Sequence, residues 1–209
     1  DDGIGPILRK FTRRGSVASP SAPASSSEAL PGPEELAAAR KIPIVHVESL
    51  NSPEGLEAVR ALRPGLAVHA GAGILRPALL DIPGLGTLNA HMGILPRYRG
   101  MNVSEWAALS GDPVGCSVHL VDPGIDTGPI VCIREVATTE AESVQALRAL
   151  VDDAQLTLLG EVLRYVTETG TVPPVRTQEG AEGVQFFRMH EELRDLLGRR
   201  LAGQSRRPA

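Results

Sequence analysis

Three polar side chains in the middle of this sequence have the types and the spacing that acyl transfer requires. Asn89 and His91 stand two residues apart in the stretch TLNAHMGILPRYRG, and Asp126 stands in the turn-rich stretch HLVDPGIDTGPI. If the first stretch begins as a strand, Asn89 and His91 point to the same face, because side chains alternate along a strand. An amide and an imidazole can donate hydrogen bonds to a developing oxyanion, and a carboxylate can carry a proton between two nitrogens. Together the three residues suit acyl transfer to an amine.

Each of these side chains also has a structural interpretation. An Asn-x-His pair at the end of a strand commonly anchors the following loop, and an Asp among Pro and Gly residues is commonly a turn residue. His119, on the strand that leads to Asp126, fits a buried and satisfied histidine as well as a functional one. Residue type and spacing alone leave both interpretations open.

A doubly wound α/β sheet is predicted to position these residues. Strands are predicted at 42–47, 66–73 and 86–91, with helices between them at 51–65 and 76–82. This alternation is typical of a mostly parallel, Rossmann-like sheet with helices on both faces. The strand at 66–73 is apolar enough to be buried on both faces. In such sheets ligands bind beyond the carboxyl ends of the strands, which is where Asn89 and His91 are expected.

The second half of the chain is predicted to add an antiparallel strand pair toward the C-terminus. A helix at 101–112 is followed by strands at 114–122 and 128–137, which the short turn around Asp126 joins. A long helix then follows, with Thr139 and Glu142 as its capping box and Gly170 at its end. A last helix is predicted at 189–202.

The N-terminal residues differ from the rest, and we expect three parts: an irregular part at 1–41, a catalytic core at 42–174 and a C-terminal extension with a helix at 175–209. The spacing of Ile7, Leu8 and Phe11 predicts a helix, and residues 16–23 a shortened strand. The strand that should precede Asp1 is absent. We therefore expect the natural product to begin upstream of Asp1 or to cover the open sheet edge by association, as in a homo-oligomer.

Composition restricts the classes of protein and partner. The 209 residues carry a formal net charge of −4, which argues against a surface that binds nucleic acid. The two cysteines, Cys116 and Cys132, form neither a disulfide framework nor a CxxC metal motif, so we expect small core residues, a reducing cytoplasmic location and no metal site. No apolar run reaches the ~20 residues that cross a bilayer, so no membrane partner is expected.

The stretches NAHMGILPRYRG and GCSVHLVDPGIDTGPI together resemble the signature of the folate-dependent formyltransferases, the group that includes glycinamide ribonucleotide and methionyl-tRNA formyltransferases. The similarity runs from about Ile42 to Pro174. It implies a 10-formyltetrahydrofolate-dependent transferase in which Asn89, His91 and Asp126 are the catalytic residues. It also implies cofactor binding, largely by backbone groups, at two segments and at a nearby histidine: Gly73, Ile74 and Leu75; Asp122, Gly124 and Ile125; and His119.

One departure from the family pattern lies beside the catalytic pair. The family often has His-Pro-Ser where this chain has His91, Met92 and Gly93. The change leaves Asn89 and His91 in place and is expected to reshape the acceptor side of the pocket.

The resemblance leaves the acceptor amine to be chosen by elimination. A glycinamide ribonucleotide enzyme needs a phosphate cradle after its first strand, where this chain has Asp1 and Asp2. A methionyl-tRNA enzyme carries a C-terminal nucleic-acid-binding domain, and a formyltetrahydrofolate hydrolase carries a regulatory N-terminal domain. We expect neither domain in the sequence given, and its charge does not suit RNA. We expect the amine of a small molecule, such as an amino sugar, an amino acid or a biosynthetic intermediate. The alternatives are a non-catalytic folate-binding relative and the glycinamide ribonucleotide or methionyl-tRNA enzymes.

Overall fold

The computed structural model describes residues 7–10 and 31–204. The chain divides into two compact units, which are described separately. Unit 1 comprises residues 1–64 and 72–82, and unit 2 comprises residues 65–71 and 83–209. The three parts expected from the sequence stay predictions. Among the described residues, no helix has both the length and the apolarity needed to span a bilayer.

The described residues of unit 1 form two paired strands and three short helices. These are β1 (Ile7–Lys10), α1 (Pro33–Ala39), β2 (Ile44–Val47), α2 (Pro53–Leu62) and α3 (Pro77–Leu80). The predicted start of α2 is confirmed, because the Ser52 hydroxyl accepts a hydrogen bond from the Gly55 N–H at 3.1 Å and Pro53 follows it. The buried core of this unit comprises Val47, Leu50, Val59, Leu75 and Leu79.

The helix predicted near the N-terminus is wrong where the structure describes it. Residues Ile7–Lys10 form β1, which pairs in parallel with β2, and Ile7 lies opposite Ile44. Backbone pairing with an apolar strand outweighs the weak helical spacing of so short a segment. Phe11 and the shortened strand predicted at 16–23 lie outside the described residues.

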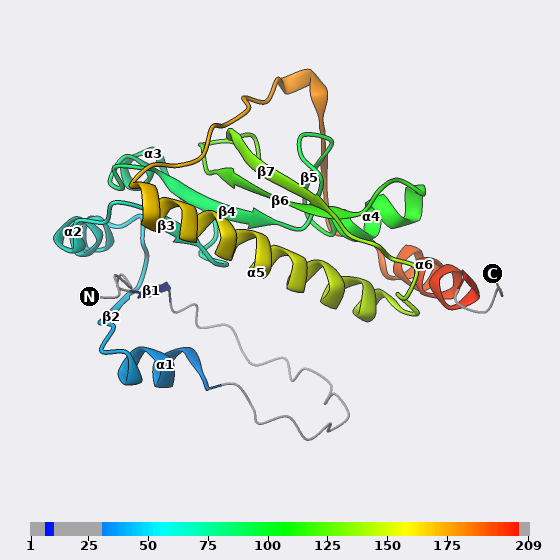
Figure 1. Cartoon of the computed structure of the whole chain (residues 1–209), viewed down its shortest axis with the longest axis horizontal. Coiled ribbons are helices and arrows are strands. Elements are labelled where there is room, and N and C mark those ends of the chain that lie inside the picture. Colours follow the sequence, from blue (N-terminus) through cyan, green and yellow to red (C-terminus); the bar gives the residue numbers. More distant parts are fainter. Residues whose placement is uncertain (1–6, 11–30, 205–209) are drawn as a thin grey trace. The chain divides into compact units, whose positions relative to one another are not determined.

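Unit 2 is built on a mixed four-stranded sheet (Figure 1). Its strands are β3 (Ala67–His69), β4 (Thr87–His91), β6 (Gly115–Leu120) and β7 (Ile130–Glu135), in the spatial order β3-β4-β6-β7. β3 and β4 are parallel, whereas β6 is antiparallel to both β4 and β7, which confirms the predicted antiparallel pair. β3 is shorter than predicted and is not buried on both faces. Val68 is 42% exposed because β3 ends the order of this sheet.

The long helix α5 (Val144–Thr169) lies along this sheet (Figure 1). It buries a stripe at helical spacing against the strands, comprising Leu147, Val151, Leu158, Val162 and Val166. The predicted capping box at Thr139 is wrong. The helix begins after Ser143, whose hydroxyl accepts from the Ala146 N–H at 3.0 Å. The predicted end at Gly170 is confirmed, since this residue caps the helix with φ 72°.

The other described helices and strands of unit 2 lie outside this four-stranded sheet. They are α4 (Val103–Ser110), the two-stranded pair of β5 (Tyr98–Gly100) with β8 (Val184–Phe186), and α6 (Glu191–Gln204), with a 3-10 turn at Gly180–Glu182. Trp106 packs on Phe186 with ring centroids 5.6 Å apart and donates its indole N–H to the Phe187 carbonyl at 2.9 Å. Trp106 is therefore a packing residue that holds α4 against Phe186 and Phe187.

A buried ion pair joins α4 to α5. Glu105 is 1% exposed and accepts hydrogen bonds from Arg148 Nε at 2.7 Å and from the Ser104 hydroxyl at 2.7 Å. Burial alone would raise the pKa of Glu105, but the Ser104 and Arg148 hydrogen bonds outweigh it and lower that pKa. The carboxylate therefore stabilises the fold only while it is ionised and paired.

Replacing Arg148 with Met is expected to lower the free energy of unfolding by about 3 kcal/mol at neutral pH, because a buried carboxylate loses its partner. The difference from the parent should shrink as pH falls, because the unpaired Glu105 of the variant takes up a proton first, and it should vanish only below the lowered pKa of Glu105 in the parent, where both folded proteins have lost the charge. Urea unfolding at several pH values measures both effects.

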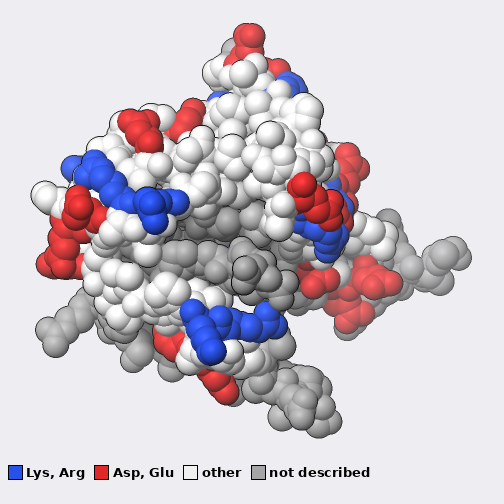
Figure 2. All heavy atoms as spheres, turned by 60° about the vertical axis from the view of Figure 1, so that its left-hand side comes forward, with Lys and Arg blue, Asp and Glu red and all other residues white. Residues whose placement is uncertain are grey.

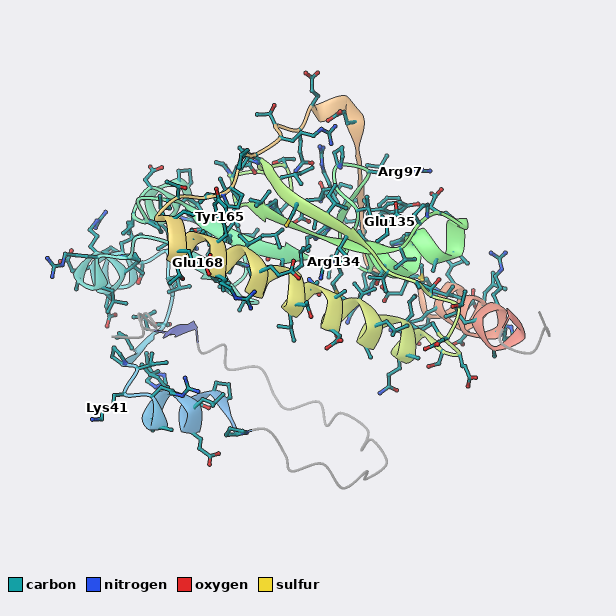
Figure 3. All side chains as sticks on the ribbon, viewed as in Figure 1. Lys41, Arg97, Arg134, Glu135, Tyr165 and Glu168 are labelled. Atoms are coloured by element: carbon teal, nitrogen blue, oxygen red, sulfur yellow. The ribbon has the colours of Figure 1, made fainter. Side chains whose placement is uncertain are left out.

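The matched control for this prediction is Arg134→Met. Arg134 on β7 pairs with Glu161 on α5 at 2.7 Å, and both side chains are at least one-third exposed (Figure 3). Loss of such a pair typically costs ~1 kcal/mol or less. Equal losses in the two variants would contradict a special role for the buried pair.

Candidate active site

The expected polar residues Asn89, His91, His119 and Asp126 meet in unit 2. Asn89 and His91 lie on β4, and His119 lies directly opposite Asn89 on the antiparallel strand β6. The Asn89 side-chain nitrogen is 3.1 Å from His119 Nε2. Asp126, in the β6–β7 loop, places one carboxylate oxygen 3.5 Å from His91 Nδ1 and the other 3.5 Å from His119 Nε2.

Asp126 is held in place by backbone groups. Its φ of 53° lies in the left-handed region, which aspartate tolerates better than most residues. Its Oδ2 accepts a hydrogen bond from the Gly100 N–H at 2.8 Å. Gly100 itself has φ 96°, and an added Cβ would lie 2.1 Å from the Phe186 carbonyl oxygen, so only glycine can present this N–H.

The hydrogen bonds define where the ring protons lie. A carbonyl can only accept, so His119 Nδ1 donates to the Leu120 carbonyl at 2.9 Å, and an amide nitrogen can only donate, so Nε2 accepts from the Asn89 amide. His91 Nε2 likewise donates to the Tyr98 carbonyl at 2.8 Å. Neutral His91 therefore turns the lone pair of Nδ1 toward the Asp126 carboxylate. Two hydrogen-bond acceptors, Nδ1 and the carboxylate, thus face each other, so the pair can take up one proton between them.

Burial and neighbouring charges shift the pKa values of His91 and Asp126. Burial lowers the pKa of His91, although the negative charge of Asp126 and the bond to the Tyr98 carbonyl act in the opposite direction. For Asp126, burial raises the pKa, but the neighbouring His119 and His91 side chains and the Gly100 N–H outweigh it, so its pKa lies below the ordinary value. At neutral pH the carboxylate is thus ionised and His91 is neutral.

His91 and Asn89 have different partners, although the sequence predicted the same role for both. The Asn89 amide nitrogen gives one hydrogen to His119, and among the described residues its second hydrogen has no acceptor. His91 already donates through Nε2 to Tyr98 and faces Asp126 through Nδ1. This arrangement favours Asn89 as the donor to an oxyanion and His91 as a partner in proton transfer.

Gln178, which the sequence did not indicate, fastens the Asp126 loop together with Arg99. Gln178 donates through its side-chain nitrogen to the carbonyls of Asp126, at 3.1 Å, and Gly128, at 2.5 Å. Its side-chain oxygen accepts from the buried Arg99 on β5, at 3.0 and 3.2 Å. No motif or period points to Gln178. The sequence offers one hint, Arg99 in the stretch PRYRG, because a buried arginine needs a hydrogen-bonding partner.

The neighbouring residues Arg97 and Tyr98 tie their own segment to Asp112. Arg97 extends away from the ribbon near β5 (Figure 3) and bonds to the Asp112 carboxylate at 2.7 Å. The Tyr98 hydroxyl donates to the same carboxylate, and its ring stacks on Phe186 with centroids 5.1 Å apart. Neither side chain contributes a group to the Asn–His–Asp cluster.

The predicted cofactor-binding loop has an internal structure of its own. The Asp122 carboxylate accepts from the Gly124 N–H at 3.1 Å and from the Thr127 hydroxyl at 2.6 Å, so it shapes the loop. Ile125 is 40% exposed next to Asp126. His119 is buried and satisfied and belongs to the cluster itself. Cofactor binding by these residues stays a prediction.

The other predicted cofactor-binding segment, Gly73–Leu75, belongs to unit 1. Its backbone is held by Asn51, which donates to the Ile74 carbonyl at 2.8 Å and accepts from the Arg76 N–H at 2.9 Å. Leu75 is buried in the core of unit 1, and the Ile74 side chain is 71% exposed. The role of this segment also stays a prediction. Among residues 7–10 and 31–204, no group of acidic, histidine or cysteine side chains is arranged to hold a metal ion.

Gly93 is required by the close packing around His91. A Cβ at this position would lie 2.8 Å from the Tyr98 carbonyl oxygen and 3.0 Å from His91 Nε2. Replacing Gly93 with Ala is expected to displace that carbonyl or the His91 ring, at a cost of about 1–3 kcal/mol. Turnover should fall together with the free energy of unfolding.

Turnover and thermal unfolding of the purified variant measure this effect, with Gly160→Ala as the matched control. Gly160 lies exposed on α5 with nothing near its Cβ position, so alanine there should stabilise the helix by up to ~1 kcal/mol. A Gly93→Ala protein with the parent's stability and turnover would contradict the packing argument.

Comparison with known proteins adds an independent finding. A family model described as "Formyl transferase" matches residues 17–163. The methionyl-tRNA formyltransferase of Trichlorobacter lovleyi is 36% identical over 146 residues, covering 69% of this chain and 46% of that protein. That of Chloroflexus aggregans is 43% identical over 129 residues, covering 60% and 42%. The chain thus spans about half the length of the curated relatives that it matches.

Solved structures agree on the fold. The formyltransferase PseJ from Anoxybacillus kamchatkensis, solved with UDP-4,6-dideoxy-4-formamido-L-AltNAc and tetrahydrofolate, matches with a TM-score of 0.58 at 18% identity, covering 75% of this chain and 82% of that chain. Glycinamide ribonucleotide transformylase 1 from Symbiobacterium toebii matches with a TM-score of 0.58 at 25% identity, covering 68% and 73%. These likenesses confirm the Rossmann-like α/β fold expected from the sequence.

Proposed function

This chain belongs to the formyl transferase family, and we propose that it moves a formyl group from 10-formyltetrahydrofolate to the amine of a small molecule. The observation that carries the proposal is the cluster of Asn89, His91, His119 and Asp126 in unit 2. The donor set fits the co-substrate, because transfer of a formyl group between nitrogens needs an N–H donor for the carbonyl oxygen and an acceptor for one proton.

The residues of the cluster divide this work between them. When bound, the co-substrate supplies an activated formyl group, and the loop with Asp122, Gly124 and Ile125 would hold it. Asn89 donates its second amide hydrogen to the formyl oxygen as negative charge develops there. Asp126 takes the proton from the attacking amine and gives it to the folate nitrogen as the C–N bond to the formyl group breaks. His91 shares that proton through Nδ1, because its lone pair already faces the carboxylate.

A small-molecule acceptor is supported by the charge of the chain. Its net charge of −4 does not favour a polyanionic acceptor, whose binding depends on many lysine and arginine contacts. On the face in Figure 2, the basic side chains of the described residues lie in small separate groups near acidic ones. An amino sugar, an amino acid or a biosynthetic amine would need only a local pocket.

Methionyl-tRNA is the second candidate acceptor. The observation in its favour is the 36% and 43% identity to methionyl-tRNA formyltransferases. The match covers only 46% and 42% of those two relatives. The shared residues therefore support the transfer chemistry more directly than they support the acceptor.

An acceptor screen tests the proposal. The purified chain is incubated with 10-formyltetrahydrofolate and a panel of amines: nucleotide-linked amino sugars, amino acids, glycinamide ribonucleotide and methionyl-tRNA. Mass spectrometry detects the formyl adduct, and calorimetry measures tetrahydrofolate binding separately. A formylated small molecule supports the first candidate, and formylated methionyl-tRNA replaces it with the second. Folate binding without any adduct would identify a non-catalytic relative.

A further inference from the structure

His69 lies against the Asn89 side chain. It is the last residue of β3, and the parallel register places it directly beside Asn89 on β4. Its Nδ1 is 3.2 Å from the Asn89 side-chain oxygen. The motifs that indicated the catalytic residues do not include His69, and the chemistry described above does not use it. Asn89 is thus held between two histidines, one on each neighbouring strand.

The direction of this hydrogen bond follows from the other end of the network. The Asn89 side-chain nitrogen can only donate, so His119 Nε2 accepts from it, and the Nδ1 proton of His119 is given to the Leu120 carbonyl. The atom of Asn89 facing His69 is the oxygen, which accepts. His69 consequently carries a proton on Nδ1 and donates it to Asn89. The orientation of the amide is fixed at both ends.

This donation changes what the amide can do. A hydrogen bond to an amide oxygen polarises the group and makes its N–H bonds stronger donors, as in other cooperative chains. The second N–H of Asn89 is the one left for the formyl oxygen. A side chain that cannot donate at position 69 would let the amide rotate or flip. Catalytic donors lose much of their effect when they are misplaced by even ~1 Å.

We propose that His69 is a positioning residue that fixes and polarises the Asn89 amide as the donor to the formyl oxygen. The proposal rests on the proposed formyl transfer. In this role His69 acts on the formyl oxygen through the Asn89 amide, to which it donates. Its loss should therefore affect kcat much more than KM, and it should have no effect in a protein that lacks the Asn89 amide.

Two variants of similar shape test this role. Leu at position 69 removes the donor, whereas Asn places an N–H near the position of Nδ1. With the amine that the acceptor screen identifies, kcat should fall about 10- to 100-fold in His69→Leu and largely recover in His69→Asn. In the Asn89→Ala background, His69→Leu should cause no further loss, because the two residues serve one hydrogen bond. Additive losses, or equal kcat values in the two His69 variants, would overturn the proposal.

A readout without turnover separates this proposal from the proposed function. In protein labelled with ¹⁵N-asparagine, the Asn89 side-chain signals are those absent from Asn89→Ala. They should shift in His69→Leu and return toward their original positions in His69→Asn. Unchanged signals in His69→Leu would contradict the hydrogen bond whether or not the protein transfers formyl groups. Shifted signals in a protein without transferase activity would leave the bond intact and reject the proposed function alone.

Discussion

Replacing Asp126 with Asn is expected to lower kcat by about 10²- to 10⁴-fold, the usual contribution of a general base. The amide oxygen of Asn can still accept from the Gly100 N–H, so the loop should keep its position. The variant loses only the charge and the proton-accepting oxygen that face His91 and His119. Turnover of the purified variant with the identified amine measures the loss.

Stability must be compared in the same variant. Burial opposes the charged form of Asp126, and its partners must compensate, so the net effect of Asp126→Asn on the free energy of unfolding should be small beside its effect on kcat. Asp152→Asn, an exposed change of the same charge on α5, is the control and should leave both quantities unchanged. Near-normal turnover of folded Asp126→Asn would remove this carboxylate from the mechanism.

The sequence indicated the cluster because its members lie either on regular strands or in a turn with a recognisable composition. Asn89 and His91 share a face of β4 through the period of two, and His119 follows from the antiparallel strand after a short turn. Asp126 was visible because Pro and Gly residues mark the loop around it. These signals are local, so they can be read along the chain without knowledge of the tertiary fold.

The supporting residues could not be found in this way. His69 reaches Asn89 only through the parallel register of β3 and β4, and Gln178 reaches the Asp126 loop from more than fifty residues away in sequence. Neither contact has a characteristic spacing. The start of α5 was misplaced for a related reason, since two hydroxyl residues, Thr139 and Ser143, are each able to cap a helix, and packing decides which does.

The dependence of activity on pH should reveal the pairing of His91 with Asp126. Burial lowers the pKa of His91 below its ordinary 6.5, so the acid limb of kcat/KM is expected below pH 6.5, where His91 gains a proton and can no longer share that of the amine. The charge of Asp126 raises the pKa of His91, opposing burial. In Asp126→Asn this opposition is removed, so the limb of the residual activity should move to still lower pH.

The pKa of His91 can also be followed directly by NMR of ¹³C-labelled histidine, with His91→Gln identifying its signal. His91→Gln should lose about 10²-fold in kcat and lack this limb, because glutamine cannot take up the proton. The midpoint for His91 should fall in Asp126→Asn and stay unchanged in Asp152→Asn, which has the same charge change far from the ring in sequence and exposed to solvent. A midpoint that rises or stays constant in Asp126→Asn would mean that the two groups do not hold one proton between them, and that the amine's proton leaves by another route.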